Sequence, residues 1–188
     1  MSSADMEVAR ELRQPTGGPQ GARKILVTGG SRSGKTRFAL AQAEALGPAR
    51  TYLATAEAWD DEMRARIQRH QAERGVGWTT VEEPLDVEPL LDRSAVVLLD
   101  CLTLWVSNLL GAKGMEADLR PRIDALVAAF QAASGSVLLV TNEVGMGLVP
   151  ETPLGRRFRD WAGILAQEAS RVADEVYLLC AGLPLRLK

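Results

Sequence analysis

The chain has 188 residues, of which 46% are hydrophobic and 24% charged, and its formal net charge is −2. This composition is typical of one soluble globular domain, and the negative balance argues against a general nucleic-acid or membrane surface, because both need excess basic charge. His70 is the only histidine and Cys101 and Cys180 the only cysteines, which excludes a cysteine–histidine metal cluster. With no signal peptide or bilayer-length apolar run, we expect a cytoplasmic protein without a membrane span and with both thiols buried and free.

Residues 1–23 are rich in serine, proline and glycine and contain few large apolar side chains. Such a segment cannot bury enough apolar surface to offset the entropy of ordering it. We therefore expect a disordered tail in residues 1–23, followed by one catalytic domain in residues 24–188.

The next stretch predicts a buried strand, a glycine loop and a helix in succession. The apolar run of residues 25–27 stops at a pair of glycines, and the helix-forming segment of residues 38–46 ends at Gly47-Pro48. Between them lies Gly-x4-Gly-Lys-Thr, the pattern of a phosphate-binding loop in the context that such a loop requires. Backbone N–H groups and the positive end of the following helix would form an anion site there. A plain strand–turn–helix corner is the alternative, and this context disfavours it.

The phosphate-loop pattern assigns roles to two side chains. Lys35 would reach the outer phosphates of a nucleoside triphosphate, and the Thr36 hydroxyl would be a ligand of Mg²⁺. The predicted nucleotide-binding loop consists of Gly29, Gly30, Ser31, Arg32, Ser33, Gly34, Lys35 and Thr36.

Downstream, residues 50–54 predict a second strand and residues 60–74 a helix with an acidic first turn. A strand at 78–81 and a short helix at 87–91 follow. Residues 95–100 form a continuous apolar run that Asp100 closes. A run that is apolar on both faces belongs in a parallel sheet, and an acid at its carboxyl end is where phosphate-loop enzymes hold magnesium. The alternative role for Asp100 is a helix cap for residues 102–110.

The rest of the chain continues to alternate. Residues 121–133 predict an amphipathic helix, 136–140 a buried strand, 153–172 a helix capped by Thr152, and 175–180 and 183–187 two further strands. The glycine-containing segment 144–152 suits a substrate lid or an ordinary long turn, and the pattern does not separate these two. Strands that alternate with helices predict an α/β fold, a single domain with a mainly parallel sheet and helices on both faces.

His70 falls on the apolar stripe of the predicted helix 60–74, among several arginines. A lone histidine on an apolar face is more often a half-buried structural residue than a catalyst. Guanidinium groups beside an imidazole, however, suit phosphate recognition and disfavour the imidazolium, which leaves the neutral ring that a nucleophile needs.

Several stretches together resemble a known family. They are Gly-Gly-Ser-Arg-Ser-Gly-Lys-Thr, Tyr-Leu-Ala-Thr, Asp-Asp-Glu-Met-Arg-Ala-Arg-Ile-Gln-Arg-His, Trp-Thr-Thr-Val-Glu-Glu-Pro, Leu-Leu-Asp-Cys-Leu-Thr-Leu-Trp-Val-Ser-Asn-Leu-Leu and Thr-Asn-Glu-Val-Gly-Met-Gly-Leu-Val-Pro. In this order, across residues 24–188, they resemble the bifunctional adenosylcobinamide kinase / adenosylcobinamide-phosphate guanylyltransferase of cobalamin biosynthesis. The last four stretches are specific to that family, whereas the phosphate loop alone is not.

The resemblance implies two reactions. A kinase step would move the γ-phosphoryl group of ATP or GTP to the aminopropanol hydroxyl of adenosylcobinamide. A guanylyltransferase step would hold GMP on a histidine and pass it to adenosylcobinamide phosphate, giving adenosylcobinamide-GDP. The resemblance also implies a recombinase-like phosphate-loop fold and a homotrimer, while the negative net charge predicts no nucleic-acid partner.

By position, the resemblance makes His70 the guanylylated residue. It also implies nucleotide contacts, besides the loop, at Ala54, Thr55, Ala56, Gln71, Ala72, Glu73, Arg74, Glu82 and Asp100. The Asn-Lys-x-Asp guanine signature of regulatory GTPases is missing from the sequence, so an acid such as Glu82 would read the guanine. Two rival functions stay open: a monofunctional phosphate-loop kinase of a small metabolite, and a nucleotide-binding switch or assembly protein.

Overall fold

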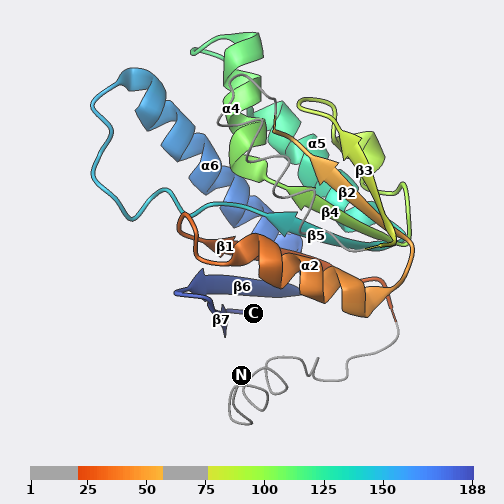
Figure 1. Cartoon of the computed structure of the whole chain (residues 1–188). Helices are drawn as coiled ribbons and strands as arrows, with labels where there is room; N and C mark the ends of the chain where they lie inside the picture. The colour runs from red at the N-terminus through yellow and green to blue at the C-terminus, as the bar shows by residue number, and fades with distance from the viewer. Residues whose placement is uncertain (1–20, 57–75) are drawn as a thin grey trace.

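The structure is a computed structural model, and it describes residues 21–56 and 76–188. Within these ranges one seven-stranded sheet forms the centre of the molecule, with the strand order β3-β2-β4-β5-β1-β6-β7 (Figure 1). All neighbouring strands are parallel except β6 and β7, which form an antiparallel pair at one edge. The strands are β1 (Lys24–Gly29), β2 (Arg50–Ala54), β3 (Trp78–Glu82), β4 (Val96–Asp100), β5 (Ser136–Val140), β6 (Glu175–Cys180) and β7 (Leu183–Arg186).

Helices cover both faces of this sheet, as the alternating pattern predicts. Helix α2 lies on one face, while α4, α5 and α6 lie on the other (Figure 1). The helices are α2 (Lys35–Leu46), α4 (Leu102–Lys113), α5 (Arg120–Ala132) and α6 (Pro153–Val172), with a short 3₁₀ turn, η1, at Glu88–Leu90. The predicted α/β class with a mainly parallel sheet is confirmed.

The strands supply two separate cores because successive side chains point to opposite faces. In β1, Leu26 is packed with α4, α5 and α6, whereas Ile25 and Val27 are packed against α2. The same alternation occurs in β4, where Leu99 belongs to the first core and Leu98 to the second. Runs that are apolar on both faces are therefore buried on both faces, as expected for central parallel strands.

The order of the strands decides what meets at the carboxyl edge. Strand β5 lies between β1 and β4, and β2 pairs with β4 on its other side, with Ala54 opposite Asp100. The carboxyl ends of β1, β2, β4 and β5 therefore lie along one edge of the sheet. Ligands of open α/β sheets bind along this edge, so the loops that follow these strands form the candidate site.

Most element predictions agree with the structure, and the differences are small. The strands predicted at 50–54, 136–140 and 175–180 have those bounds, and Thr152 caps α6 by accepting a hydrogen bond from the Gly155 N–H group at 3.1 Å. The predicted helix 60–74 and most of the predicted tail lie outside the described residues. No helix in the described ranges is long and apolar enough to cross a membrane.

One prediction about the cysteines is wrong. Both thiols are free, and Cys101 is buried, but Cys180 is exposed. Cys180 is the last residue of β6, beside the edge strand β7, where no further strand covers it among the residues that the structure describes. An apolar run beside a cysteine therefore did not guarantee that the final residue of the run would be buried.

Candidate functional site

The loop between β1 and α2 has the backbone of an anion-binding turn. Gly34 is the N-cap of α2 with φ 94°, a left-handed conformation that favours glycine, and no side chain caps the helix. Arg32 is also left-handed, with φ 56°, and the Ser33 N–H group donates to the Gly30 carbonyl oxygen at 3.3 Å. The uncapped helix end and the turn direct backbone N–H groups toward one place, which is the arrangement that binds phosphate.

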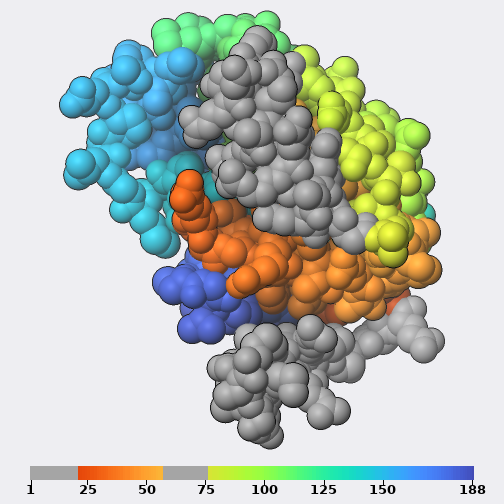
Figure 2. All heavy atoms as spheres, viewed as in Figure 1, coloured from red at the N-terminus to blue at the C-terminus, as the bar shows by residue number. Residues whose placement is uncertain are grey.

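Glycine at position 29 is required by close contacts. A Cβ atom there would lie 2.5 Å from the carbonyl oxygen of Leu179 and 2.8 Å from Ser33 Oγ. The loop is also held from two sides: the Glu143 N–H group donates to the Gly29 carbonyl oxygen at 2.9 Å, and the Gly182 N–H group donates to the Ser33 carbonyl oxygen at 3.0 Å. Figure 2 shows this loop, in deep orange, between the segment that follows β5 and the β6–β7 edge.

Lys35 is the first residue of α2 and is buried, and its Nζ donates to the Gly30 carbonyl oxygen at 2.8 Å. The side chain therefore bends back over its own loop. A lysine in this position can exchange a loop carbonyl for a phosphate oxygen with little movement, because its flexible stem carries a compact charge.

The two predicted magnesium ligands are in direct contact. Thr36 Oγ1 donates to Asp100 Oδ2 at 2.9 Å, although the residues are 64 positions apart in the chain. Tyr52 donates from its hydroxyl to the same oxygen at 2.8 Å. A hydroxyl and a carboxylate, both hard oxygen donors, thus lie side by side next to the phosphate loop.

The alternative role of Asp100 as a helix cap does not fit the structure. The N-cap residue of α4 is Cys101, and no side-chain hydrogen bond caps this helix. The Asp100 carboxylate instead accepts hydrogen bonds from the side chains of Thr36 and Tyr52.

A buried polar layer lies behind Asp100. Thr55 Oγ1 accepts from the Cys101 N–H group at 2.9 Å and donates to the Cys101 carbonyl oxygen at 2.8 Å. The Cys101 thiol contacts Thr103 Oγ1 at 3.1 Å, and Asn142 Nδ2 donates to the same hydroxyl at 2.7 Å. Burial, and then the nearby charge of Asp100, raise the pKa of the Cys101 thiol to about 11. These hydrogen bonds connect the residues that follow β2, β4 and β5.

The remaining predicted contacts are at the same edge, but with different exposure. The Ala54 carbonyl oxygen accepts from the Glu83 N–H group at 2.9 Å, and Ala56 follows it half-buried. The side chain of Thr55 is fully buried and committed to Cys101, so only its backbone remains for a ligand. Glu82 ends β3 opposite Ala54 and is exposed.

Some predicted site residues cannot be placed. His70, Gln71, Ala72, Glu73 and Arg74 lie outside the described residues. The structure therefore brings together the phosphate loop, Thr36 and Asp100, with Glu82 at the end of β3, two places away from β4 in the sheet. The histidine lies outside the described residues.

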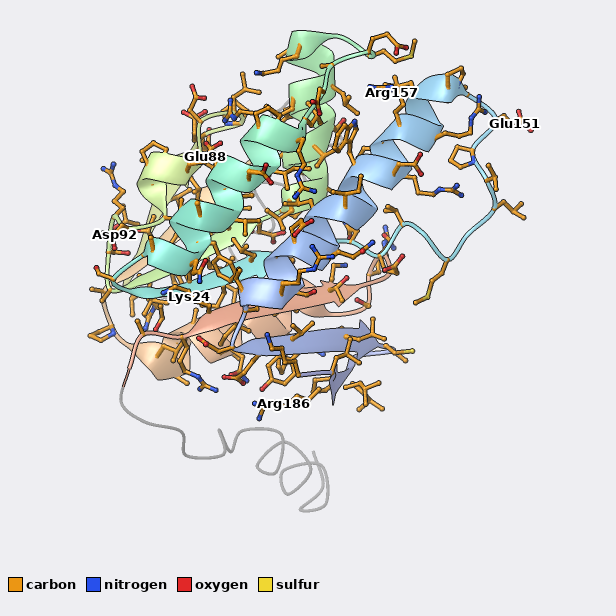
Figure 3. All side chains as sticks on the ribbon, turned by 180° about the vertical axis from the view of Figure 1, so that it is seen from behind. Lys24, Glu88, Asp92, Glu151, Arg157 and Arg186 are labelled. Atoms are coloured by element: carbon orange, nitrogen blue, oxygen red, sulfur yellow. The ribbon has the colours of Figure 1, made fainter. Side chains whose placement is uncertain are left out.

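The segment between β5 and α6 begins at the phosphate loop and is apolar and exposed. Met146, Leu148 and Val149 are 82%, 96% and 64% exposed, so the described structure does not cover them. Figure 3 labels Glu151 near the end of this segment, on the side of the molecule opposite Lys24. Both earlier interpretations, a lid and a long turn, remain compatible with this geometry.

Sequence reasoning missed Tyr52. It appeared only as a strand residue, although a tyrosine on the buried face of a strand carries a hydroxyl that needs a partner. That requirement, together with the acid at the end of the neighbouring strand, was the signal available in the sequence.

The fold and the loop together define an α/β protein with a mainly parallel sheet and a phosphate-binding loop after β1. The flagellar accessory protein FlaH from Methanocaldococcus jannaschii is similar in structure, with a TM-score of 0.51 and 14% sequence identity over 97% of this chain and 84% of that one. At this identity the likeness concerns the fold alone.

The particular family follows from sequence. The family model for "Cobinamide kinase / cobinamide phosphate guanyltransferase" matches residues 25–187, and the chain belongs to this family. Two relatives named bifunctional adenosylcobalamin biosynthesis protein CobU are 43% identical (Salmonella typhimurium) and 42% identical (Escherichia coli), each over 87% of this chain and 99% of the relative. CobP of Pseudomonas aeruginosa is 42% identical over 87% of this chain and 96% of its own length. The predicted family is confirmed, and with it an enzyme class that combines a kinase and a guanylyltransferase.

Proposed function

We propose that this protein phosphorylates the aminopropanol hydroxyl of adenosylcobinamide with ATP or GTP, and then transfers GMP from GTP to adenosylcobinamide phosphate. The product would be adenosylcobinamide-GDP. The observation that carries the proposal is the 2.9 Å contact between Thr36 Oγ1 and Asp100 Oδ2 beside a phosphate loop, in a chain of a kinase and guanylyltransferase family.

The donor set of this contact fits Mg²⁺. Thr36 supplies a hydroxyl oxygen and Asp100 a carboxylate oxygen, the hard ligands that Mg²⁺ prefers together with phosphate oxygens. Bound with the nucleotide, Mg²⁺ would neutralise charge on the phosphate groups. Ser33 Oγ is buried without a hydrogen-bond partner in the described part of the chain, and buried hydroxyls are nearly always paired, so the loop retains a polar group for a ligand or water.

In the kinase step the acceptor hydroxyl oxygen attacks the γ-phosphorus, the bond to the β–γ bridging oxygen breaks, and the hydroxyl proton is released. The chain contributes positioning and charge: the loop N–H groups and the α2 N-terminus bind the β- and γ-phosphates, and Lys35 neutralises the leaving oxygen. The exposed apolar segment after β5 starts beside the loop, and the acceptor would bind against it.

In the guanylyl step a neutral His70 nitrogen attacks the α-phosphorus of GTP and pyrophosphate leaves. A phosphate oxygen of adenosylcobinamide phosphate then attacks the same phosphorus, the phosphorus–nitrogen bond breaks, and a pyrophosphate linkage forms. A covalent intermediate divides a difficult transfer between two anions into two easier ones. The Glu82 carboxylate, exposed at the end of β3, would accept hydrogen bonds from the guanine N–H groups.

The remaining parts of the proposal concern the protein as a whole. We propose that residues 24–188 form the catalytic domain, since β1 begins at Lys24 and the family model begins at residue 25. The resemblance supports a cytoplasmic homotrimer that uses ATP and GTP, both with Mg²⁺.

Covalent labelling tests the guanylyl step. We expect the wild-type protein, incubated with GTP and no acceptor, to retain label from the α-phosphate but not from the γ-phosphate after denaturation. The bond should be labile in acid and stable in alkali, because a phosphorus–nitrogen bond has this behaviour and a serine or threonine ester does not. His70→Ala should abolish the label and guanylyl transfer while retaining kinase activity, since the phosphate loop is unchanged.

A control variant removes another nucleophile. Cys180→Ala deletes the exposed thiol and should label as the wild type does. Label on His70→Ala would place the nucleophile elsewhere, and the absence of label on the wild type would favour a monofunctional kinase.

A further inference from the structure

Tyr52 occupies a position that its packing fixes independently of the site. It is 4% exposed, and its ring lies edge-on to Trp78 of β3, with ring centroids 6.1 Å apart at 77°. Trp78 is itself held, because the Arg50 guanidinium lies 5.3 Å from its ring centroid and its Nε1 donates to Glu44 Oε1 at 3.4 Å. The direction of the phenol is therefore set by apolar packing, which a phenylalanine would reproduce.

The hydroxyl of this ring adds a specific contact. It donates to Asp100 Oδ2 at 2.8 Å, and Thr36 Oγ1 donates to the same oxygen at 2.9 Å. Asp100 Oδ1 accepts no hydrogen bond from any residue in the described ranges. Two donors on one oxygen hold the carboxylate in one orientation and leave the other oxygen for a ligand.

Sheet register makes this contact possible. Tyr52 pairs with Leu98 and Ala54 pairs with Asp100, so Tyr52 lies two residues before the position opposite the acid. Residues two apart on a strand share a face, and a long aromatic side chain reaches the diagonal neighbour on the next strand. The phenol therefore reaches Asp100 from β2, while the Thr36 hydroxyl reaches the same oxygen from α2.

We propose that Tyr52 is a positioning residue for divalent-cation binding, which acts by holding Asp100 beside Thr36. The inference rests on the proposed function, because it requires Asp100 to be a cation ligand. Hydrogen bonds to a carboxylate are stronger than those between neutral groups, and partners that orient a metal ligand contribute to metal affinity.

The chain offers a matched control, because it contains only one other tyrosine. Tyr177 also donates its hydroxyl to a carboxylate, Glu175 Oε2 at 2.5 Å, and its ring also packs on an aromatic neighbour, Phe38, with centroids 5.0 Å apart. Tyr52→Phe and Tyr177→Phe thus remove the same kind of hydrogen bond, one at Asp100 and one away from it. Asp100→Asn provides the benchmark for loss of the ligand itself.

The test measures cation binding directly on the full chain. Each protein is loaded with GDP and titrated with Mn²⁺, and free Mn²⁺ is followed by electron paramagnetic resonance. We expect Tyr52→Phe to weaken Mn²⁺ binding about tenfold, the usual lower end for losing a group that orients a metal ligand. Asp100→Asn should weaken it at least as much, and Tyr177→Phe should match the wild type. Kinase turnover of Tyr52→Phe should recover at saturating Mg²⁺, because the nucleotide contacts are intact.

Each other result overturns the inference in a recognisable way. If Asp100→Asn loses Mn²⁺ affinity while Tyr52→Phe does not, Tyr52 serves packing alone and the proposed cation site stands. If the Mn²⁺ affinity of Asp100→Asn is unchanged, Asp100 is not a cation ligand, and Tyr52 does not position one. Equal losses in Tyr52→Phe and Tyr177→Phe would indicate general destabilisation, which the melting temperatures of the two variants would show.

Discussion

Two buried lysines lie at opposite ends of the central strand and its loop. Lys24 and Lys35 are each 7% exposed, and each donates hydrogen bonds from Nζ to backbone carbonyls. Lys24 begins β1 at the amino end of the sheet, and Lys35 begins α2 at the carboxyl end. Burial and hydrogen bonding alone do not distinguish these residues.

What separates the two lysines is the origin of their partners. Lys24 Nζ bonds to the carbonyl oxygens of Ala133 and Gly135, both 2.8 Å away and over 100 residues along the chain. Burial lowers the pKa of Lys24, and the charges of Asp174 and Asp92 partly oppose this effect. Figure 3 shows Lys24 and Asp92 at the same end of the sheet. This lysine ties the α5–β5 connection to β1, which is a structural role.

The Lys35 contact at 2.8 Å is instead to Gly30, five residues earlier in the same loop. A charge above a flexible loop, at a helix N-terminus, can transfer its hydrogen bond to an incoming anion. The comparison therefore predicts opposite consequences for the two lysines: loss of activity at one and loss of stability at the other.

The largest expected effect is that of Lys35→Ala on turnover. We expect both half-reactions to fall about a hundredfold to a thousandfold, because removing one electrostatic contact to a reacting group costs that much. The melting temperature should change little, since the Gly30 carbonyl that Lys35 contacts belongs to the same short loop. Steady-state rates of phosphorylation and of guanylyl transfer measure the loss. Near-normal rates of both reactions would contradict the role assigned to the loop.

Lys24→Met should have the reverse profile. It removes two buried hydrogen bonds and leaves their carbonyl groups unpaired, which should cost about 2–3 kcal/mol of unfolding free energy. For a chain of this size that corresponds to a melting temperature lower by about 4–12 °C. The activity of the folded fraction should match the wild type, and a selective loss of activity would show that the amino end of the sheet contributes to the site.

The pH dependence of the unfolding free energy provides a further test of the structural role of Lys24. Burial holds the pKa of Lys24 in the folded protein below its ordinary value of 10.5, so at alkaline pH the folded state loses this proton before the unfolded state does. Because the unfolded state then binds more protons, stability rises with pH in the window between the folded pKa and 10.5. Denaturant titrations at a series of alkaline pH values should therefore show the wild type gaining stability relative to Lys24→Met across that window.

The smallest effect concerns the two thiols, one at the end of β4 and one at the end of β6. Cys180 is exposed, whereas Cys101 is buried with its thiol pKa raised to about 11. A thiol reagent at neutral pH should therefore label one cysteine in the folded protein and two after denaturation, since thiolate is the reactive form. Mass spectrometry of the labelled peptides identifies the modified cysteines. Rapid labelling of Cys101 would mean that the buried polar layer behind Asp100 opens to solvent.

Local patterns predicted the parts of the molecule that local physics controls. The phosphate loop was predictable because the strand end, the Gly-x4-Gly-Lys-Thr pattern and the helix start follow one another directly in the chain. The anion site is also built mainly from backbone N–H groups. The end of β4 was predictable too, because the apolar run is broken by Asp100. The two cysteines show the limit of this reasoning, since both adjoin apolar runs and only the position of β6 near the sheet edge exposes Cys180.

The sequence by itself determined the class of fold, the phosphate loop and the family, because each depends on residues that are neighbours in the chain. Only the tertiary structure decided that Tyr52 and Thr36 donate hydrogen bonds to the same oxygen of Asp100. It also decided that Lys24, at the opposite end of the sheet, donates to the Ala133 carbonyl oxygen. These contacts join residues 48 to 109 positions apart. They exist because the strand order places β2 beside β4 and the register sets Ala54 opposite Asp100, and periodicity within a segment contains no information about order or register between segments.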